Sequence, residues 1–365
     1  MKFSVSREEL LKPLQTVIGV VERRQTMPIL SNVLLSLRGR ELGVTGTDLE
    51  VELVARAEVD VEAAGEVTVP GRKLHDICRA LPDGSTLEVA VSGDRLNIKA
   101  GRSRFTLSTL KAGDFPTIED IAAQHTLEVG QRELHDLLQR TQFSMAQQDV
   151  RYYLNGLLLE TSGKTLRAVA TDGHRLALSE MSLENGVAKD EQVIVPRKGV
   201  LELNRLLESD GELKIGLGAS HIRVEKAGTR LTSKLIDGRF PEYQRVIPKE
   251  PTNIITADRE LLRHALQRTA ILSNEKYRGV RLELSENSVV MQANNPEQEE
   301  AVETLEVEYG GENMEIGFNV NYLLDALGAI DSGQVTIGLT DGNSSCLIQS
   351  PQSTSTKYVV MPMRL

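Results

Sequence analysis

The same sequence plan begins three times along this chain of 365 residues, and the three copies account for its whole length. The copies align on a Glu-Leu pair near the start of each one, at residues 9–10, 133–134 and 260–261. The register persists further along, where Thr47-Asp48 matches Thr171-Asp172 and Val69-Pro70 matches Val195-Pro196. Triplication of one unit is typical of a structural array rather than of a single catalytic centre. We therefore predict three domains, over residues 1–125, 126–251 and 252–365.

Each copy carries the pattern of an α+β domain made of two similar halves. A half begins with an apolar strand, continues with a helix that has Leu and Ile at three- or four-residue spacing, and ends with alternating strands. Ser6 and Asp258 precede two of the opening helices and are natural N-caps. Helices of the second halves are expected over residues 73–81, 198–207 and 321–327. The predicted fold class is α+β, with two helices packed on antiparallel sheets in each domain.

The composition is acidic, and the acidity is uneven. Net charge is −10, with 16 basic and 18 acidic residues in the first copy, 18 of each in the second, and 8 basic and 16 acidic in the third. A nucleic-acid binder is usually basic overall, so the total charge alone argues against that class. Cys78 and Cys346 fall at unrelated positions and are interpreted as buried thiols in a reducing compartment. We expect a cytoplasmic protein without a membrane segment.

One segment, Thr171-Asp-Gly-His-Arg175, invites an enzymatic interpretation because Asp172 and His174 could form an acid–base pair. An Asp-Gly turn explains the Asp equally well, since Thr47-Asp48 occupies the same place in the first copy. The six histidines are scattered, and the sequence has no zinc, phosphate-loop or dinucleotide motif. We therefore expect no catalytic residue, no metal and no cofactor.

Basic residues recur on most of the predicted helices, among them Arg197 and Lys198. Any one such helix is well explained as a solvated face. Repetition favours a second interpretation, in which an acidic protein presents a basic inner surface to phosphates. The acidic run Pro296–Glu303 in the third copy and the basic Arg102–Arg104 in the first would also suit head-to-tail association, which closes into a ring when the rotation permits.

The order of motifs along all three copies resembles the bacterial DNA polymerase III β subunit family, the sliding clamps. In the first two copies the resemblance rests on Lys12-Pro-Leu14, Thr45-Gly-Thr-Asp-Leu49, Gly101-Arg-Ser-Arg-Phe105, Asp149-Val-Arg-Tyr-Tyr-Leu-Asn-Gly156 and Thr171-Asp-Gly-His-Arg-Leu176. Later it rests on Asp237-Gly-Arg-Phe-Pro241, Ile271-Leu-Ser-Asn-Glu-Lys276, Asn294-Asn-Pro-Glu-Gln-Glu-Glu300 and Met361-Pro-Met-Arg-Leu365.

The resemblance implies a non-catalytic processivity factor, in which two protomers form a ring around duplex DNA. It implies sequence-independent DNA contacts by Arg24, Gln148, Tyr152, Tyr153, Arg197 and Lys198. It implies a dimer interface that pairs Lys73, Arg104, Phe105 and Leu107 with Ile271, Leu272, Glu297, Glu299 and Glu300. It implies a peptide-binding pocket made by Leu154, Thr171, Gly173, His174, Arg175, Leu176, Pro241, Arg245, Val246, Asn319, Tyr322, Val359, Val360, Met361, Pro362, Met363 and Arg364.

The partners implied by the resemblance are duplex DNA, a second copy of the chain, the DNA polymerase III α subunit, the clamp loader, and other polymerases and repair proteins with short clamp-binding motifs. Two alternatives stay open from the residues alone. One is a hydrolase that uses Asp172 and His174, and the other is an interaction scaffold with no role on DNA.

Overall fold

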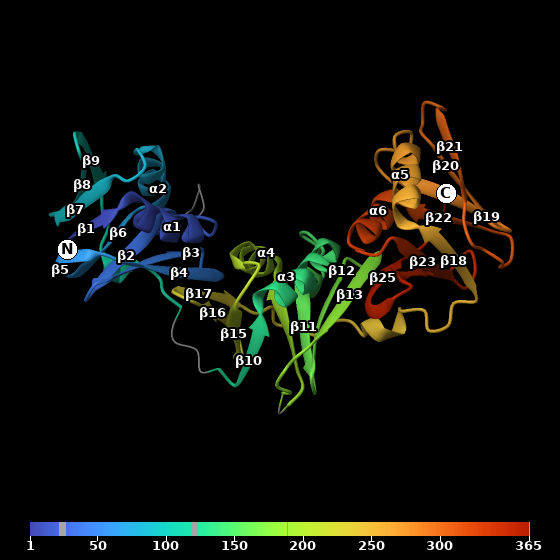
Figure 1. Cartoon of the computed structure of the whole chain (residues 1–365), viewed down its shortest axis with the longest axis horizontal. Coiled ribbons are helices and arrows are strands. Elements are labelled where there is room, and N and C mark those ends of the chain that lie inside the picture. Colours follow the sequence, from blue (N-terminus) through green and yellow to red (C-terminus); the bar gives the residue numbers. More distant parts are fainter. Residues whose placement is uncertain (22–26, 119–122, 188, 365) are drawn as a thin grey trace. The chain divides into compact units, whose positions relative to one another are not determined.

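The computed structural model describes residues 1–21, 27–118, 123–187 and 189–364. The chain forms two compact units (Figure 1). Unit 1 comprises residues 1–132 and 198–235, and unit 2 comprises residues 133–197 and 236–365. The middle copy of the repeat therefore contributes one half to each unit. Among the described residues there are six α-helices, and all the strand pairs within the sheets are antiparallel.

Unit 1 contains two sheets. The first has, in spatial order, β5 (Asp60–Ala63), β1 (Lys2–Ser6), β7 (Thr86–Ser92), β8 (Arg95–Ala100) and β9 (Ser103–Ser108). The second has β10 (His125–Gly130), β15 (Glu212–Leu217), β16 (His221–Lys226), β17 (Thr229–Lys234), β4 (Val51–Glu58), β3 (Glu41–Thr47), β2 (Asn32–Arg38) and β6 (Gly65–Pro70).

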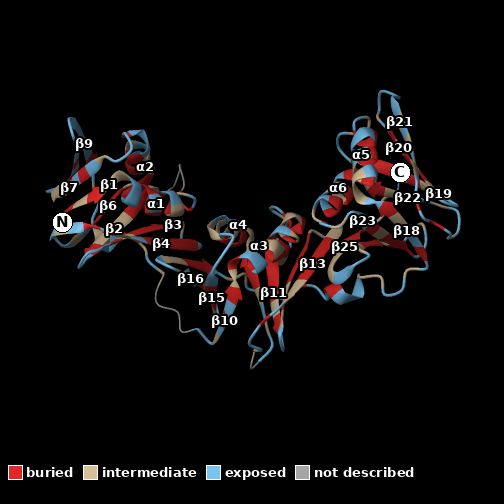
Figure 2. Ribbon diagram, viewed as in Figure 1, coloured by how far each residue is buried: buried red, intermediate tan, exposed pale blue. Residues whose placement is uncertain are grey.

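Three helices belong to unit 1 apart from the first residue of the last one: α1 (Arg7–Val17), α2 (Gly71–Ala80) and α4 (Arg197–Leu206). The predicted cap of α1 is confirmed, because the Ser6 hydroxyl accepts from the Glu9 backbone N–H and the Glu9 carboxylate accepts from the Ser6 N–H. The helices bury their apolar faces against the sheets, where the ribbon is mostly buried (Figure 2). Arg205 of α4 donates to the carbonyls of Gln15 and Thr16, which ties the middle copy to the first.

Unit 2 repeats this plan. Its larger sheet has, in spatial order, β14 (Glu191–Pro196), β11 (Gly156–Ser162), β12 (Thr165–Thr171), β13 (Arg175–Ser182), β25 (Ser353–Val360), β24 (Cys346–Ser350), β23 (Gln334–Leu339) and β18 (Asn253–Asp258). Its smaller sheet has β21 (Glu300–Glu306), β20 (Ser288–Asn294), β19 (Gly279–Ser285) and β22 (Met314–Asn319).

The helices of unit 2 are α3 (Gln131–Gln139), whose first two residues are assigned to unit 1, α5 (Arg259–Ala270) and α6 (Val320–Gly328). The predicted cap of α5 is confirmed by the Leu261 N–H, which donates to Asp258. An aliphatic core joins α5 and α6 to both sheets and includes Phe318 and Tyr358, which are almost fully buried. Burial of this apolar surface is the main force that holds the unit together.

The sheets cross the boundaries between sequence copies. In unit 1, β4 of the first copy pairs with β17 of the second, and in unit 2, β13 of the second copy pairs with β25 of the third. These strands lie at the edges of single copies, so each pairing satisfies backbone groups that a lone copy would expose. The sequence pattern predicts the fold class correctly but does not predict this joining of copies into continuous sheets.

Candidate functional site

The same turn occurs in both units. Each time it lies beside the strand pair that joins two sequence copies, β4–β17 in unit 1 and β13–β25 in unit 2, which we call the seam of that unit. In unit 2 the Thr171 hydroxyl donates to the Arg175 carbonyl over 2.6 Å and accepts from the Gly173 N–H. In unit 1 the Thr47 hydroxyl makes the same two bonds, to Val51 and Leu49. Gly173 and Leu49 both have positive φ, at 89° and 77°, so the first copy places a Leu where glycine is more usual. The turn fixes the strands on which the site is built.

Asp172 serves this turn. One carboxylate oxygen accepts from the backbone N–H groups of His174 and Arg175, at 2.9 and 3.0 Å, and the other accepts from the Arg175 guanidinium at 3.1 Å. Asp48 accepts from two backbone N–H groups in the same way in unit 1. Both oxygens of Asp172 are therefore engaged in holding structure, which is the role that the turn interpretation assigns to this residue.

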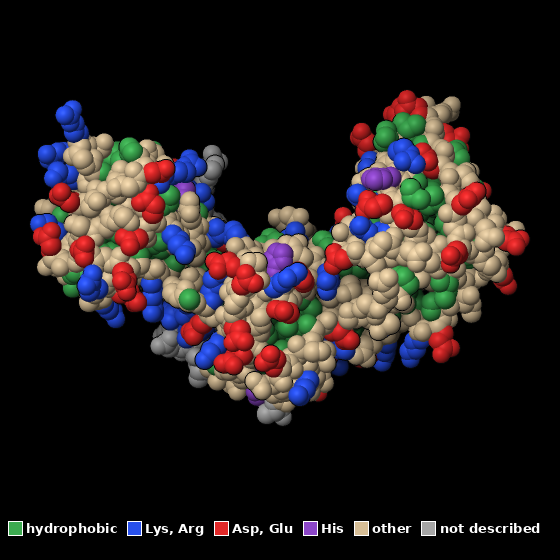
Figure 3. Space-filling model, viewed as in Figure 1, with side chains coloured by type: hydrophobic (Ala, Val, Ile, Leu, Met, Phe, Trp, Pro, Cys, Tyr) green, Lys and Arg blue, Asp and Glu red, His purple; other side chains and the backbone are tan. Residues whose placement is uncertain are grey.

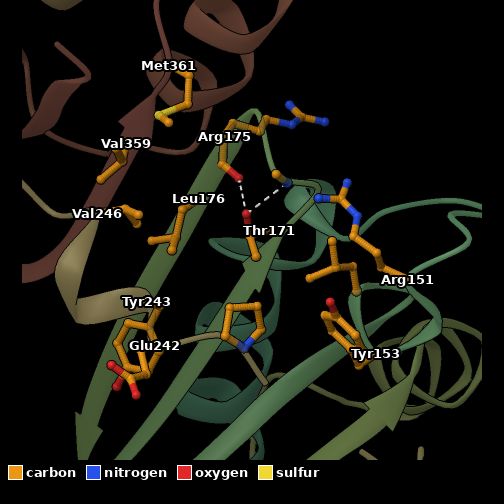
Figure 4. Close-up of a pocket in the computed structure, with 13 residues that line it drawn as sticks. Arg151, Tyr153, Thr171, Arg175, Leu176, Glu242, Tyr243, Val246, Val359 and Met361 are labelled. Carbon is orange, nitrogen blue, oxygen red and sulfur yellow. Dashed lines mark hydrogen bonds between the residues drawn. The ribbon is translucent and has the colours of Figure 1, made fainter. Parts of the chain in front are cut away.

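A pocket of about 180 Å³ opens over the strands that follow this turn (Figure 4). Nine residues predicted for the pocket line it: Leu154, Thr171, Gly173, Arg175, Leu176, Pro241, Val246, Val359 and Met361. Four lining residues were not predicted for the pocket: Arg151, Glu242, Tyr243, and Tyr153, which was predicted as a DNA contact. The aromatic and charged residues that flank Leu154 and Pro241 in sequence were a usable signal for these four.

The pocket has an apolar floor. Leu176 of β13 lies directly opposite Val359 of β25, which in turn lies opposite Leu347 of β24. All three belong to one buried apolar cluster that also includes Phe240 and Tyr243. Figure 4 shows Val246 and Tyr243 on one side of Leu176, with Arg151 and Tyr153 on the other. Such a cavity, apolar with a few polar groups at its margin, is suited to apolar side chains of a ligand.

Arg175 joins the floor strand to α6. Its guanidinium donates to Asp325 over 2.5 Å and to the Phe143 carbonyl over 2.7 Å. The same group lies over the ring of Tyr322, 4.5 Å from the centroid, and 5.5 Å from that of Phe143. Burial, with Asp172 nearby, raises the pKa of Tyr322. A planar cation held by carboxylates and rings fixes this side of the pocket.

The opposite side is fixed by an arginine–carboxylate pair. Arg151 donates to both oxygens of Asp149, at 3.0 and 2.8 Å, and to the Asp172 carbonyl at 3.2 Å. Hydrogen bonds from Arg151 lower the pKa of Asp149 to about 2. This bidentate pair stays ionised at neutral pH and directs the Arg151 side chain along the pocket margin.

The remaining residues predicted for the pocket lie around it or behind it. Tyr322 stacks on Arg175, and Asn319 caps α6 by accepting from the Asn321 N–H. Val360 is buried in the core, while the His174 carbonyl accepts from the Met361 N–H. Arg245 pairs with Glu242 on the surface, and Pro362 lies in the segment beyond β25. Met363 and Arg364 line a second cavity of unit 2, beside Tyr277 and Arg281.

The residues predicted to contact DNA belong to short segments and to α4. Gln148 is exposed with positive φ, and the exposed Tyr152 packs edge-on against Tyr153. Arg197 donates to the Met145 carbonyl, whereas Lys198 forms an ion pair with Asp48. Arg24 lies outside the described residues.

The residues predicted for the dimer interface lie at or near two sheet edges. In unit 1, Arg104, Phe105 and Leu107 lie on the edge strand β9, and Lys73 is exposed on α2. In unit 2, Glu300 begins the edge strand β21, with the exposed Glu297 and Glu299 just before it. Ile271 is exposed and Leu272 half-buried at the end of α5. Figure 3 shows basic side chains over the β8–β9 hairpin and acidic ones over the β20–β21 end.

Three family descriptions match consecutive stretches of the chain. Residues 1–119 match the N-terminal domain of the DNA polymerase III β subunit, residues 128–242 its central domain, and residues 244–364 its C-terminal domain. The chain therefore belongs to the DNA polymerase III β subunit family, whose members are built from three clamp domains and are not enzymes. The hydrolase hypothesis for Asp172 and His174 is wrong.

Full-length relatives carry the name β sliding clamp. The Pseudomonas aeruginosa protein is 57% identical over 367 residues, and the Escherichia coli protein is 53% identical over 367 residues, with both chains covered completely in each comparison. A solved structure of the Pseudomonas aeruginosa sliding clamp bound to griselimycin has a TM-score of 0.97 and 57% identity, again covering 100% of both chains. The fold and the family assignment thus agree.

Residues 1–21, 27–118, 123–187 and 189–364 hold no group of three or more His, Cys, Asp and Glu side chains suited to a metal ion. None of the helices that the structure describes has the length and apolarity needed to span a membrane.

Proposed function

We propose that this chain is a DNA sliding clamp that works as a closed homodimeric ring around duplex DNA. The full-length match to proteins named β sliding clamp carries this proposal. In it, the three clamp domains cover residues 1–125, 126–251 and 252–365, and the ring acts in the bacterial cytoplasm. Its processivity arises from topology, because a ring that encloses DNA slides along the duplex without needing strong contacts.

Complementary sheet edges support head-to-tail dimerisation. The edge strand β9 of one protomer offers unpaired backbone groups together with Arg104, and β21 offers the same groups with Glu300 beside it. Strands of opposite charge at two free edges can extend a sheet between protomers, while the apolar Ile271 adds a buried contact. Lys73, Phe105, Leu107, Leu272, Glu297 and Glu299 complete the proposed interface.

Duplex DNA would be contacted weakly and without regard to sequence. Gln148, Tyr152, Tyr153, Arg197, Lys198 and Arg24 are the proposed contacts. Tyr152 is 58% exposed and offers an aromatic face, whereas the charge of Lys198 is already balanced by Asp48. A DNA-facing surface with few unpaired cations would allow sliding, because strong phosphate binding would hold the protein at one place on the duplex.

The pocket of unit 2 is the proposed docking site for short linear segments of partners. These are the DNA polymerase III α subunit, the clamp loader, and other polymerases and repair proteins. The apolar floor supports this role, since it can bury Leu- or Phe-like side chains of an extended segment. By analogy with the named relative, the pocket is also the proposed site for griselimycin.

The topological proposal is tested by retention on DNA. The protein is placed on nicked circular duplex by a clamp loader and is then washed in high salt. We expect the protein to remain on the circle and to leave promptly when the circle is cut, because its release then requires only sliding off an end. Salt weakens contacts that depend on phosphate ion pairs, so equal salt-sensitive loss from circular and linear DNA would refute the ring.

A further inference from the structure

One wall of the pocket is a connecting segment that belongs to neither sheet of unit 2. Residues 240–246 run between β17 and β18 and include the short 3₁₀ helix Tyr243–Arg245. Their backbone N–H groups donate locally, Tyr243 to Pro241, Arg245 to Glu242, and Val246 to Tyr243, while the Val246 carbonyl accepts from the Ser345 hydroxyl over 3.4 Å. Bonds of this range shape the segment but do not fix its distance from the pocket floor. That distance must be set by contacts with the sheet.

The Tyr243 hydroxyl makes such a contact. It donates to the Glu160 carboxylate over 2.5 Å and accepts from the Arg167 guanidinium over 3.1 Å. Arg167 donates to the same Glu160 oxygen at 2.9 Å and to Glu180 at 2.9 Å. Burial raises the pKa of Tyr243, and the bond to Glu160 adds to this, so the phenol stays protonated. The hydroxyl is therefore a fully satisfied donor and acceptor.

Its partners form a polar row across four neighbouring strands. Gln192, Glu160, Arg167 and Glu180 lie opposite one another on β14, β11, β12 and β13. Burial opposes ionisation of Glu160, but hydrogen bonds from Tyr243, Gln192 and Arg167 outweigh it and lower the pKa of Glu160. Arg167 stays charged, so Arg167 and Glu160 form an ion pair at neutral pH. None of these four residues lines the pocket.

The equivalent seam in unit 1 has different residues at these positions. Ile118 stands where Tyr243 does, counted from the matching Phe115 and Phe240. Ser36 and Gly43, which lie opposite each other on β2 and β3, stand where Glu160 and Arg167 do. In that unit the connecting segment bonds to the sheet through its backbone, as the Ile118 N–H donates to Glu52. The hydroxyl anchor thus belongs to the seam that has the apolar pocket.

We propose that Tyr243 is a positioning residue for the docking pocket: the Glu160–Arg167 row holds its hydroxyl and thereby sets the 240–246 wall at the distance that a ligand requires. The proposal rests on the docking function given above. A wall that is fixed before binding costs less conformational entropy when the ligand arrives, so the anchor contributes to affinity without touching the ligand.

The test is calorimetric titration of the full-length protein with griselimycin. Tyr243→Phe removes only the hydroxyl and keeps the ring that lines the pocket. The matched control is Tyr309→Phe, because Tyr309 is also a buried tyrosine of unit 2, and its hydroxyl donates to the Glu312 carbonyl over 2.5 Å away from the pocket lining. We expect Y243F to weaken binding about 5- to 10-fold and Y309F to leave it unchanged, with thermal unfolding recorded for both.

A second variant tests whether Tyr243 acts through the row. Glu160→Ala lies outside the pocket lining and should weaken griselimycin binding to the same degree as Y243F. The double variant should lose no more than the larger single variant, because both changes release one anchor. Wild-type affinity in Y243F, equal losses in Y243F and Y309F, or additive losses in the double variant would each overturn the proposal. Failure of the wild-type protein to bind griselimycin would instead remove the docking function itself.

Discussion

The two seams between sequence copies share one backbone plan and carry opposite chemistry. In unit 2 the row of facing residues under the connecting segment is Leu347, Val359 and Leu176. In unit 1 the matching row is Arg223, Thr232 and Glu52. The match is fixed by the repeated turn, because Leu176 and Glu52 each follow its threonine by five residues. One seam is therefore apolar and the other charged at the same place.

In the charged seam the connecting segment is bonded to this row. Glu52, only 2% exposed, accepts from the Ile118 N–H at 2.9 Å and lies 3.5 Å from the Arg230 guanidinium. The connecting segment is thus bonded directly to the row, whereas in unit 2 it is anchored further along the sheet through Tyr243. The two units therefore differ at this place in two respects. In unit 2 the row is apolar, and the connecting segment is anchored away from it.

The strongest test of this comparison places the unit 1 residue in unit 2. Leu176→Glu puts a carboxylate on the pocket floor opposite Val359, where no arginine replaces Leu347 to balance it. Burying such a charge costs several kcal/mol, so we expect griselimycin affinity to fall by more than about 100-fold, with some loss of stability. Titration calorimetry gives the affinity, and circular dichroism verifies folding. Leu176→Met is the volume-matched control and should bind within a few-fold. Binding of L176E within tenfold of wild type would contradict the role of the apolar row.

A second exchange concerns the residue before that row. Arg175 of unit 2 corresponds to Val51 of unit 1, and the arginine donates to Asp325 and stacks on Tyr322, both on α6. Arg175→Val should lower the free energy of unfolding of unit 2 by about 2–4 kcal/mol, because charged hydrogen bonds and a cation–π contact are lost. Urea unfolding followed by circular dichroism measures the loss. The control Arg239→Val removes an exposed arginine and should cost less than about 0.5 kcal/mol. Equal losses of unfolding free energy in R175V and R239V would contradict a stabilising role for the contacts of Arg175 with α6.

The sequence was informative about elements and weaker about their assembly. The α+β class, the helix caps at Ser6 and Asp258 and the turn at Asp172 follow from local pattern, and the structure agrees. The pairing of β4 with β17 and of β13 with β25 depends on contacts between strands more than 170 residues apart, which periodicity cannot encode. The anchor of Tyr243 was missed for the same reason, since Glu160 lies 83 residues away. The sequence shows which residues are charged, but it does not show which of them lie opposite one another on the paired strands of a seam.

The smallest expected effect is the pH dependence of stability that arises from Glu52 in the seam of unit 1. Burial raises the pKa of Glu52, although the Ile118 N–H and the Arg230 and Arg223 guanidinium groups oppose the shift. The folded protein therefore holds this proton more tightly than the unfolded chain, whose Glu pKa is about 4.3, and stability falls as pH rises from there toward the raised value. Glu52→Gln has no such proton.

We therefore expect the stability of E52Q relative to wild type to increase as pH rises from about 4 to 7, by less than the effect of R175V. Glu66→Gln gives a control of opposite sign, because hydrogen bonds from Arg38 and Ser36 lower the pKa of Glu66. Wild type should gain on E66Q as pH rises through the window just below the usual Glu value. Urea unfolding across this pH range measures both differences. If the stability of wild type relative to E52Q instead increases as pH rises, ionised Glu52 stabilises unit 1 through its ion pairs, and the expectation of a net burial cost is wrong.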